Sequence, residues 1–444
     1  MLNSIDIFSH LPCFLQNVVC TFVGWKIYRR RYNSNFFSIL AKYENHEYDT
    51  HLELKKFLAA AIGSPFWRKR FIEYGINLQA DDIESEIKKL PVLSKAEVKQ
   101  NLKDLINSQY NGKVFTLHTS GTTGSGLVFP YSVEMENHQW AVWWRYRRMH
   151  GLDFNTWCGW FGGKMIFSLH KRKPPYYLIN YFLRQIMFSA YHLTPDTVSC
   201  YYETIRDKKL SWLHGYPSQL SLLANLICEA SLPVLECVKT ISFGAENLLE
   251  NQVASIRHVF PNARLIQHYG LAEGVANISQ HPNDELIVDS DFCMLEFLPL
   301  SSREPQICRI IGTGFRNPVF PLIRYDTGDL AHIEYTSDGK LLIKSIDGRN
   351  EDCIRLPSGL RLGRLDHIFK DFPQINEAQI HQISINFIEI LIVRGTTYTK
   401  AVEQRLYAEF LSRLGTEVKI QFRYCDSIPR TRAGKLKFVI SEVK

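Results

Sequence analysis

Strand-like and helix-like segments alternate along the middle of this chain, and this alternation restricts the fold more than any other feature of the sequence. A strand followed by a helix and a further strand is typical of βαβ units, which build a mostly parallel sheet covered by helices. Ligands of such sheets bind beyond the carboxyl ends of the strands, so the residues after each strand are candidate site residues. The helical segments are 202–208, 217–231 and 248–258, and the strand-like segments are 210–214, 238–243 and 263–268.

The chain is too long for one hydrophobic core. Its 444 residues favour two or three domains, and the last hundred or so have a pattern of their own. Strands are expected there at 377–384, 387–393 and 417–424, with a helix at about 399–413. We therefore predict an α/β fold with a large N-terminal domain, 1–347, built on mostly parallel sheets with flanking helices, and a small α+β C-terminal domain, 348–444.

Composition excludes several classes of function. The net charge of +7 is a small excess, and no nucleic-acid-binding motif accompanies the basic residues, so we expect no nucleic-acid partner. The ten cysteines form no CxxC pair and no Cys/His cluster, which argues against a disulfide framework and against structural zinc. A reducing cytoplasm fits best.

An amphipathic helix is expected at about 11–28. Its apolar stripe ends in a basic run, and the run follows the apolar residues instead of preceding them, which argues against a signal peptide. The stripe is also too short to span a bilayer. Packing against the protein's own core and peripheral contact with an anionic membrane surface both stay open. The stripe comprises Leu11, Phe14, Leu15, Val18, Val19, Phe22 and Val23, and the basic run comprises Lys26, Arg29, Arg30 and Arg31.

A strand at 114–118 runs into a loop rich in glycine and hydroxyl groups, 119–126. Its backbone N–H groups and hydroxyls suit the oxygens of a triphosphate. The loop contains no lysine, so it is not the Walker A loop of a P-loop kinase or ATPase. A plain flexible turn is the alternative. The candidate phosphate contacts are Thr119, Ser120, Gly121, Thr122, Thr123 and Gly124.

This loop is the first of five motifs. Their occurrence in one chain in this order is far more specific to a protein family than any single motif. The others are Tyr269-Gly270-Leu271-Ala272-Glu273, Arg324-Tyr325-Asp326-Thr327-Gly328-Asp329, Gly348-Arg349, and Pro429-Arg430-Thr431-Arg432-Ala433-Gly434-Lys435. The set resembles the adenylate-forming enzyme superfamily, and within it the phenylacetate-CoA ligase branch and the CapK-type proteins of capsular polysaccharide gene clusters. The chain departs from the superfamily at Gly126 and Leu127, where many members have proline and lysine.

The resemblance implies an ATP-dependent ligase that forms an acyl-adenylate, releases pyrophosphate, and passes the acyl group to coenzyme A or an amine. It implies ATP or AMP, Mg²⁺ and coenzyme A as ligands, and a small domain that is mobile about a hinge. The implied roles are Lys435 as the catalytic lysine, Glu273 as the catalytic Mg²⁺ ligand, Gly244, Ala245, Glu246 and Tyr269 around the adenine, Asp329 and Arg349 on the ribose and α-phosphate, and Glu351 at the hinge.

The acid itself is not identified by the sequence, and aromatic acids and sugar uronic acids both stay open. We expect its pocket near Trp143, Phe161, His214 and Tyr216. Coenzyme A is the favoured acceptor, because basic residues could attract its phosphates. They are Arg145, Arg147, Arg148, Lys171, Arg172 and Lys173. The alternative is a catalytically silent assembly component of a polysaccharide machine, although such a protein would not need Glu273, Asp329, Arg349 and Lys435 together.

Overall fold

The structure is a computed structural model of the chain. It describes residues 8, 11–118, 127–162, 166–168, 171–302, 304–349, 354–357, 361–362, 365, 368–369, 372, 374–415, 417–430 and 436–443. Within these residues, no helix has the length and hydropathy of a bilayer-spanning segment.

The chain divides into two compact units, each made of segments that are far apart in the sequence. The first contains residues 1–25, 154–266 and 350–444, and the second contains residues 26–153 and 267–349. Helix α2 (Cys13–Arg31) and strand β8 (Arg264–Gly270) each begin in the first unit and end in the second. The predicted division after residue 347 is a different partition and stays a prediction.

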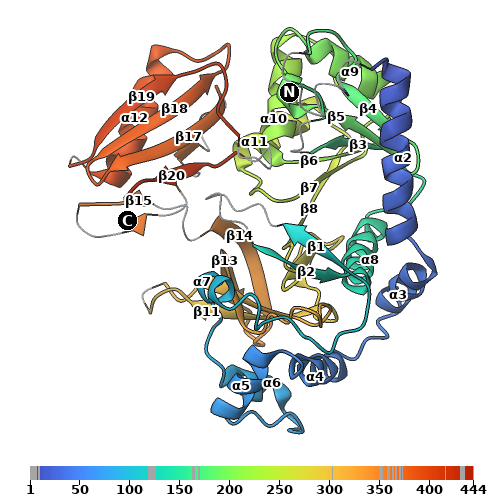
Figure 1. Cartoon of the computed structure of the whole chain (residues 1–444). Coiled ribbons are helices and arrows are strands. Elements are labelled where there is room, and N and C mark those ends of the chain that lie inside the picture. Colours follow the sequence, from blue (N-terminus) through green and yellow to red (C-terminus); the bar gives the residue numbers. More distant parts are fainter. Residues whose placement is uncertain are drawn as a thin grey trace. The chain divides into compact units, whose positions relative to one another are not determined.

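Parallel strands and their helices form the larger part of the first unit (Figure 1). Strand β3 pairs in parallel with β5 and β6, β6 pairs in parallel with β7, and β4 closes the edge antiparallel to β5. Helix α10 starts with a proline in its first turn, where no N–H partner is needed. The bounds are β3 Cys158–Phe161, β4 Tyr177–Asn180, β5 Gln185–Phe188, η1 Ala190–His192, α9 Val198–Asp207, β6 Trp212–Gly215, α10 Pro217–Glu229, β7 Thr240–Phe243 and α11 Glu250–Val259.

The C-terminal residues of the first unit form a four-stranded sheet, in the order β19-β18-β17-β20, with α12 on one face (Figure 1). Helix α12 begins where the Thr399 side chain accepts a hydrogen bond from the N–H of Val402, and it ends at Gly415, whose φ is 77°. Its apolar side shares a core with the strands. All four elements predicted after residue 376 are confirmed. The bounds are β15 Ile354–Arg355, β16 Arg361–Leu362, β17 Ile375–Ser384, β18 Phe387–Arg394, α12 Lys400–Leu414, β19 Lys419–Tyr424 and β20 Val439–Ser441.

Antiparallel strands dominate the second unit. Its sheet has the order β11-β12-β13-β14-β10-β9-β8, and a separate hairpin, β1 with β2, flanks the loop 119–126. The α/β fold is therefore confirmed, with β3, β5, β6 and β7 paired in parallel in the first unit and antiparallel pairs in the sheet of the second. The bounds are α3 Ser34–Glu44, α4 Thr50–Ala61, α5 Pro65–Glu73, α6 Ile83–Lys88, α7 Lys95–Gln100, β1 Val114–His118, β2 Val128–Ser132, α8 Val133–Met149, β9 Asn277–Gln280, β10 Leu286–Val288, β11 Cys293–Pro299, β12 Ile307–Gly314, β13 Tyr325–Tyr335 and β14 Leu341–Arg349.

Helix α2 confirms the predicted N-terminal helix, but its apolar stripe does not pack against the protein's own core. The only buried residues of α2 are Gln16 and Gly24. The large apolar residues are instead exposed over 37% to 66% of their surface. The interpretation of this stripe as a core face is therefore wrong. The exposed residues are Phe14, Leu15, Val18, Val19, Phe22 and Val23.

A buried histidine in the second unit stays neutral. His138 on α8 is only 6% exposed, and its Nδ1 lies 2.9 Å from the hydroxyl of Tyr43 on α3. Burial, reinforced by the charge of Arg316, lowers the pKa of His138 well below its ordinary value. In the unfolded chain the same imidazole takes up a proton as the pH falls below about 6.5.

We predict that His138→Gln reduces the loss of stability on acidification. Above about pH 6.5 both states are neutral at this position, and below it only the unfolded state binds the proton, so the free energy of unfolding falls by up to about 1.4 kcal/mol per pH unit. The measurement is urea unfolding between about pH 5 and about pH 8. The same change at exposed His51 is the control and should keep the wild-type slope. An unchanged slope in His138→Gln would contradict the neutral assignment.

Candidate active site

Three parallel strands of the first unit end in register at one edge of the sheet. Phe161 at the end of β3 pairs with Gly215 at the end of β6, and Gly215 pairs with Phe243 at the end of β7. The residues that follow, including Tyr216 and the segment 244–246, therefore leave the sheet at the same edge. Ligands of parallel sheets bind at such an edge.

Aromatic and hydroxyl groups converge beside this edge. The buried hydroxyl of Ser242 accepts a hydrogen bond of 2.8 Å from Trp212 Nε1 and lies 2.8 Å from His214 Nδ1. The ring of Trp160 is 4.3 Å from that of His214, centroid to centroid. Ser242 thus fixes the imidazole against an aromatic wall. Trp160 belongs to the segment 160–164 that the sequence also suggests as a wall of the pocket, whereas sequence reasoning missed Ser242 and Trp212, because neither belongs to a motif.

The remaining predicted pocket residues lie in different surroundings. Tyr216 is the N-cap residue of α10, directly at the edge described above. Phe161 is fully buried and stacks on Phe188 with the rings 4.6 Å apart, so it is a core residue and not part of the proposed pocket. Trp143 belongs to the second unit, where its Nε1 donates a hydrogen bond of 3.0 Å to Asn277.

Glu246 holds the C-terminal segment at the sheet edge. One carboxylate oxygen accepts a hydrogen bond of 2.8 Å from the N–H of Leu436, and the other accepts one of 3.2 Å from the N–H of Ser218. Ala245, just before it, has a φ of 69°, in the left-handed region that non-glycine residues seldom adopt. Backbone strain of this kind is common at functional sites, where the surrounding structure has to maintain it.

Arg430 fixes the same segment from its other end. Its guanidinium donates a hydrogen bond of 2.9 Å to the Ser218 hydroxyl and pairs with Glu377 on β17. Burial raises the pKa of Glu377 while the charge of Arg430 opposes that rise, so the ion pair stabilises the ionised carboxylate. Both ends of the segment 430–436 are therefore bound at the edge, and Lys435 is the residue next to Leu436.

The second unit brings three of the predicted nucleotide residues together. The hydroxyl of Tyr269, at the end of β8, donates a hydrogen bond of 2.8 Å to Asp329 on β13. Asp329 is directly opposite Arg349 on the antiparallel partner strand β14. Burial and the charge of Asp329 raise the pKa of Tyr269 well above its ordinary value, so this hydroxyl remains a donor. Strands β13 and β14 form a hairpin between these residues, with its tip at 336–340.

The other polar residues of this motif hold the turn. Arg324 donates from its guanidinium to Glu296 and to the carbonyl of Lys88, 2.8 Å away. Asp326 pairs with Arg309 and accepts the N–H of Gly328, whose φ of 75° suits glycine. Asp329 is therefore the member of the motif that is paired with Tyr269, and its neighbours support the backbone around it.

Glu273 follows β8 in the second unit, and its charge acts on both Tyr131 and Tyr269. The described residues contain no group of three or more His, Cys, Asp or Glu side chains that could hold a metal ion. Mg²⁺ is commonly bound through one or two carboxylates together with substrate phosphates. A single carboxylate at Glu273 fits that mode.

The basic residues expected to attract coenzyme A are not all available. Arg145 is buried and pairs with Asp289 and Asp291, and Arg147 is buried within 5.3 Å of the rings of Trp140 and Trp144. The expectation that these two attract phosphates is wrong, because Arg145 is neutralised by its own partners and neither guanidinium is exposed. Arg148 is half-exposed and pairs with Glu44. Arg172 and Lys173 are exposed.

Some predicted site residues lie outside the described residues. They are Thr119, Ser120, Gly121, Thr122, Thr123 and Gly124 of the loop, Glu351 at the proposed hinge, and Lys435 itself. For Arg349 the structure describes the backbone alone.

Removal of Arg145 should destabilise the second unit severely. Arg145→Met leaves two buried carboxylates without their cation, which costs about 3–5 kcal/mol of unfolding free energy. Arg148→Met, on the same helix, removes a half-exposed pair and should cost about 0–1 kcal/mol. Chemical denaturation of the two variants tests the difference. Equal stability would mean that Arg145 is not the buried partner of Asp289 and Asp291.

Known proteins resemble this chain in sequence and in structure. Residues 358–442 match the model of the CapK C-terminal domain family. The chain is 24% identical over 460 residues to Protein CapK of Staphylococcus aureus, and the match covers 100% of both chains.

Two solved structures of 2-hydroxyisobutyryl-CoA ligase have a similar fold. The structure in the postadenylation state in complex with R3-HIB-AMP is 16% identical, with a TM-score of 0.66, and the match covers 88% of this chain and 89% of that one. The structure in complex with 2-HIB-AMP and CoA in the thioesterification state is 18% identical, with a TM-score of 0.52 and 89% of each chain covered. The resemblance expected from the motifs is confirmed: the chain is CapK-like along its whole length and has the fold of the adenylate-forming enzymes.

Proposed function

We propose that this protein is an ATP-dependent ligase that activates a carboxylic acid as an acyl-adenylate and then transfers the acyl group to coenzyme A or an amine. The observation that carries the proposal is the attachment of Arg430 and Leu436, which flank the lysine in the sequence, to the sheet edge. The N–H of Leu436 is bound to Glu246, and Arg430 is bound to Ser218. The described residues on either side of 431–435 are therefore bound where the parallel strands terminate, and Lys435 is part of that stretch of the sequence.

The proposed first step joins the acid to the nucleotide. An oxygen of the acid's carboxylate attacks the α-phosphorus of ATP, a bond forms between them, and the bond to the leaving pyrophosphate breaks. Lys435 offsets the negative charge that develops on the phosphate. Asp329 accepts hydrogen bonds from the ribose hydroxyls, with Tyr269 donating to its other side. Mg²⁺ held through Glu273 would supply further charge neutralisation on the phosphates.

The acid is proposed to approach along the edge lined by Trp160, His214 and Tyr216. The ring of Trp160 offers a flat apolar surface, and the imidazole that Ser242 orients offers a polar group beside it. This combination suits a planar or cyclic acid, whether aromatic or a sugar acid. In the second step the acceptor attacks the acyl carbon, the acyl–phosphate bond breaks, and AMP leaves.

Coenzyme A remains the proposed acceptor, with Arg172 and Lys173 as the exposed cations available to its phosphates. We further propose that the reaction belongs to surface polysaccharide biosynthesis, because the likeness to Protein CapK extends over the full chain. A cytoplasmic location is proposed as well, since all nine cysteines that the structure describes are free thiols.

We predict that one member of a panel of aromatic and sugar acids triggers pyrophosphate release from ATP and Mg²⁺, and that Lys435→Ala slows this release by about a hundredfold or more. Nucleotide affinity should be nearly unchanged, because the lysine acts on charge that develops during the reaction. Coenzyme A and simple amines are added separately to identify the acceptor. Nucleotide binding without pyrophosphate release for any acid would instead favour the catalytically silent alternative.

We also predict that Asp329→Ala weakens ATP binding by about 1–3 kcal/mol, the usual cost of removing a charged hydrogen-bond partner. Calorimetric titration with ATP and Mg²⁺ measures the loss. The matched control is Asp326→Asn, three residues earlier in the same strand, because Asp326 is engaged with Arg309 and should leave ATP affinity close to that of the wild type. Identical affinities in both variants would remove Asp329 from the ribose site.

A further inference from the structure

Helix α2 packs in the opposite way to an ordinary surface helix. Polar side chains attach it to the rest of the unit, and its apolar side chains are exposed. The side chain of Asn17 accepts a hydrogen bond of 2.9 Å from the N–H of Ile179, and the hydroxyl of Thr21 donates one of 3.3 Å to the carbonyl of the same residue. Ile179 belongs to β4, the edge strand of the parallel sheet. Both backbone groups of an edge residue are thus satisfied by α2.

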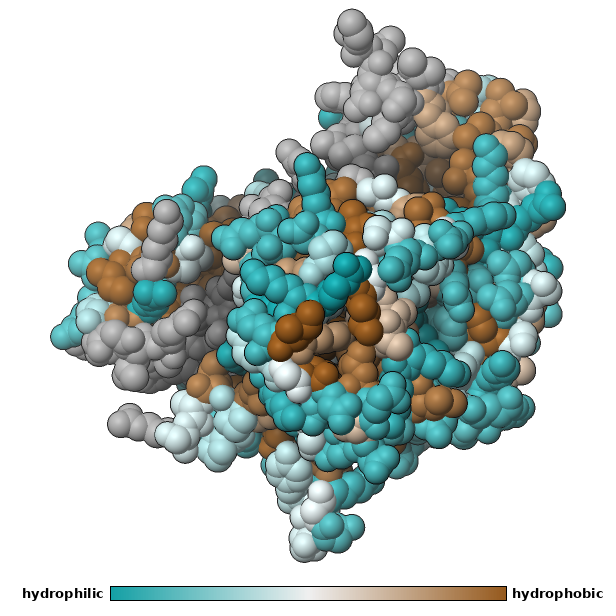
Figure 2. Space-filling model, turned by 60° about the horizontal axis from the view of Figure 1, so that its bottom comes forward, coloured by the Kyte–Doolittle hydropathy of each residue, from teal (hydrophilic) through white to brown (hydrophobic). Residues whose placement is uncertain are grey.

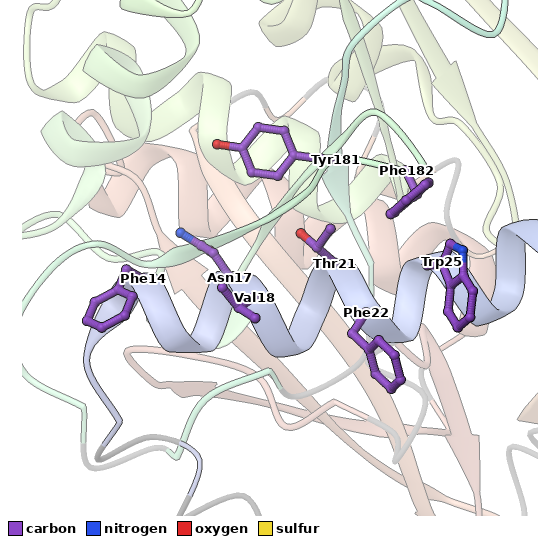
Figure 3. Close-up of a pocket in the computed structure, with 8 residues that line it drawn as sticks. All are labelled: Phe14, Asn17, Val18, Thr21, Phe22, Trp25, Tyr181 and Phe182. Atoms are coloured by element: carbon purple, nitrogen blue, oxygen red, sulfur yellow. The ribbon is translucent and has the colours of Figure 1, made fainter.

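A glycine lets the helix approach this closely. A Cβ built on Gly24 would lie 2.1 Å from Oδ1 of Asn180, which is itself buried. Figure 3 shows Asn17 and Thr21 pointing toward the chain that carries Tyr181 and Phe182, while Phe14 and Phe22 point away from it. The side of α2 that faces solvent is therefore fixed by the docking contacts, and it is the apolar side.

The exposed residues form one continuous surface. Scattered apolar side chains are ordinary on protein surfaces, and Figure 2 shows such patches among hydrophilic side chains on the face it presents. Here, however, α2 and the turn after β4 together line a groove of about 590 Å³. The turn adds two exposed aromatic residues, Tyr181 and Phe182. The groove is lined by Phe14, Asn17, Val18, Thr21, Phe22, Trp25, Tyr181 and Phe182 (Figure 3).

The two segments that border the groove carry positive charge alone. No Asp or Glu occurs from residue 7 to residue 43, and none occurs from 154 to 195. Arg184, at the end of the aromatic turn, is exposed with its guanidinium 5.7 Å from the Trp157 ring. Lys26 and Arg29 are exposed on the last turns of α2 itself. An apolar surface rimmed by cations is complementary to an anionic one.

We propose that this groove face, formed by α2 and residues 181–184, seats the protein on the surface of an anionic lipid bilayer. Phenylalanine, valine, tryptophan and tyrosine are the side chains that bury themselves at the boundary between head groups and acyl chains. The basic residues around them interact with the anionic head groups. A second copy of the chain fits less well, because an interface made by this face in both copies would bring two sets of cations together. The inference does not depend on the proposed ligase reaction.

Flotation of the full-length protein with lipid vesicles tests this proposal. Vesicles of equal parts phosphatidylcholine and phosphatidylglycerol should bind the protein, and vesicles of phosphatidylcholine alone should bind it more weakly. The double variant Phe14→Ser with Phe22→Ser should bind anionic vesicles at least about tenfold more weakly, because two large apolar side chains no longer enter the bilayer. High salt should weaken wild-type binding as well.

The matched control is the double variant Ile72→Ser with Tyr335→Ser. These residues are 79% and 67% exposed and lie outside the groove face, so their loss should leave vesicle binding unchanged. Urea unfolding shows whether each variant remains folded, and sedimentation shows its mass. Absence of wild-type binding to anionic vesicles, or equal loss in both double variants, would overturn the proposal. A change from dimer to monomer in the groove variant, with no vesicle binding by the wild type, would identify the face as a contact between copies instead.

Discussion

The parallel register of β3, β6 and β7 is the constraint on which the candidate site depends. Since Phe161, Gly215 and Phe243 pair in one row, every segment that leaves these strands does so at the same edge. Tyr216 and Glu246 both follow strands that end at that edge, although 29 residues separate them in the sequence. Glu246 then extends the constraint to the end of the chain, through its hydrogen bond with the N–H of Leu436. A carboxylate that follows a buried strand thereby binds the backbone of the residue next to Lys435 in the sequence.

In the second unit, buried ion pairs fix the positions of the turns and side chains. Arg324 binds Glu296 and two carbonyl groups, and so holds the turn that leads to Asp329. Arg145 binds Asp289, which also accepts hydrogen bonds from Asn277 and Ser279. Such pairs contribute less to net stability than their number implies, because each charge loses its hydration. These pairs mainly fix geometry. A buried charge without its partner is costly, so few other arrangements of these side chains are stable.

Much of the fold could be predicted because the relevant signals are local. Strand and helix periodicity, the hairpin around residues 336–340 and the elements after residue 376 all depend on residues close together in sequence. The failures have long-range causes. The pattern 11–28 identifies an amphipathic helix, but only Ile179, far along the chain, determines which side docks. The sequence does not reveal the partners of Arg145, because Asp289 and Asp291 come close to it only in the folded chain. The motif residues Tyr269 and Asp329 can be recognised because they stand in motifs of known spacing, whereas Ser242 and Trp212 belong to no such motif.

The central claim is that this protein joins a carboxylate oxygen to the α-phosphate of ATP. Heavy-oxygen labelling of the acid's carboxylate tests it most directly, once an acid that supports pyrophosphate release is known. In the proposed reaction the attacking oxygen stays on phosphorus when the acceptor displaces AMP, so mass spectrometry should find one heavy oxygen atom in each AMP formed. AMP without heavy oxygen, formed together with pyrophosphate, would show that water and not the carboxylate attacks the α-phosphate, and it would contradict the adenylation account.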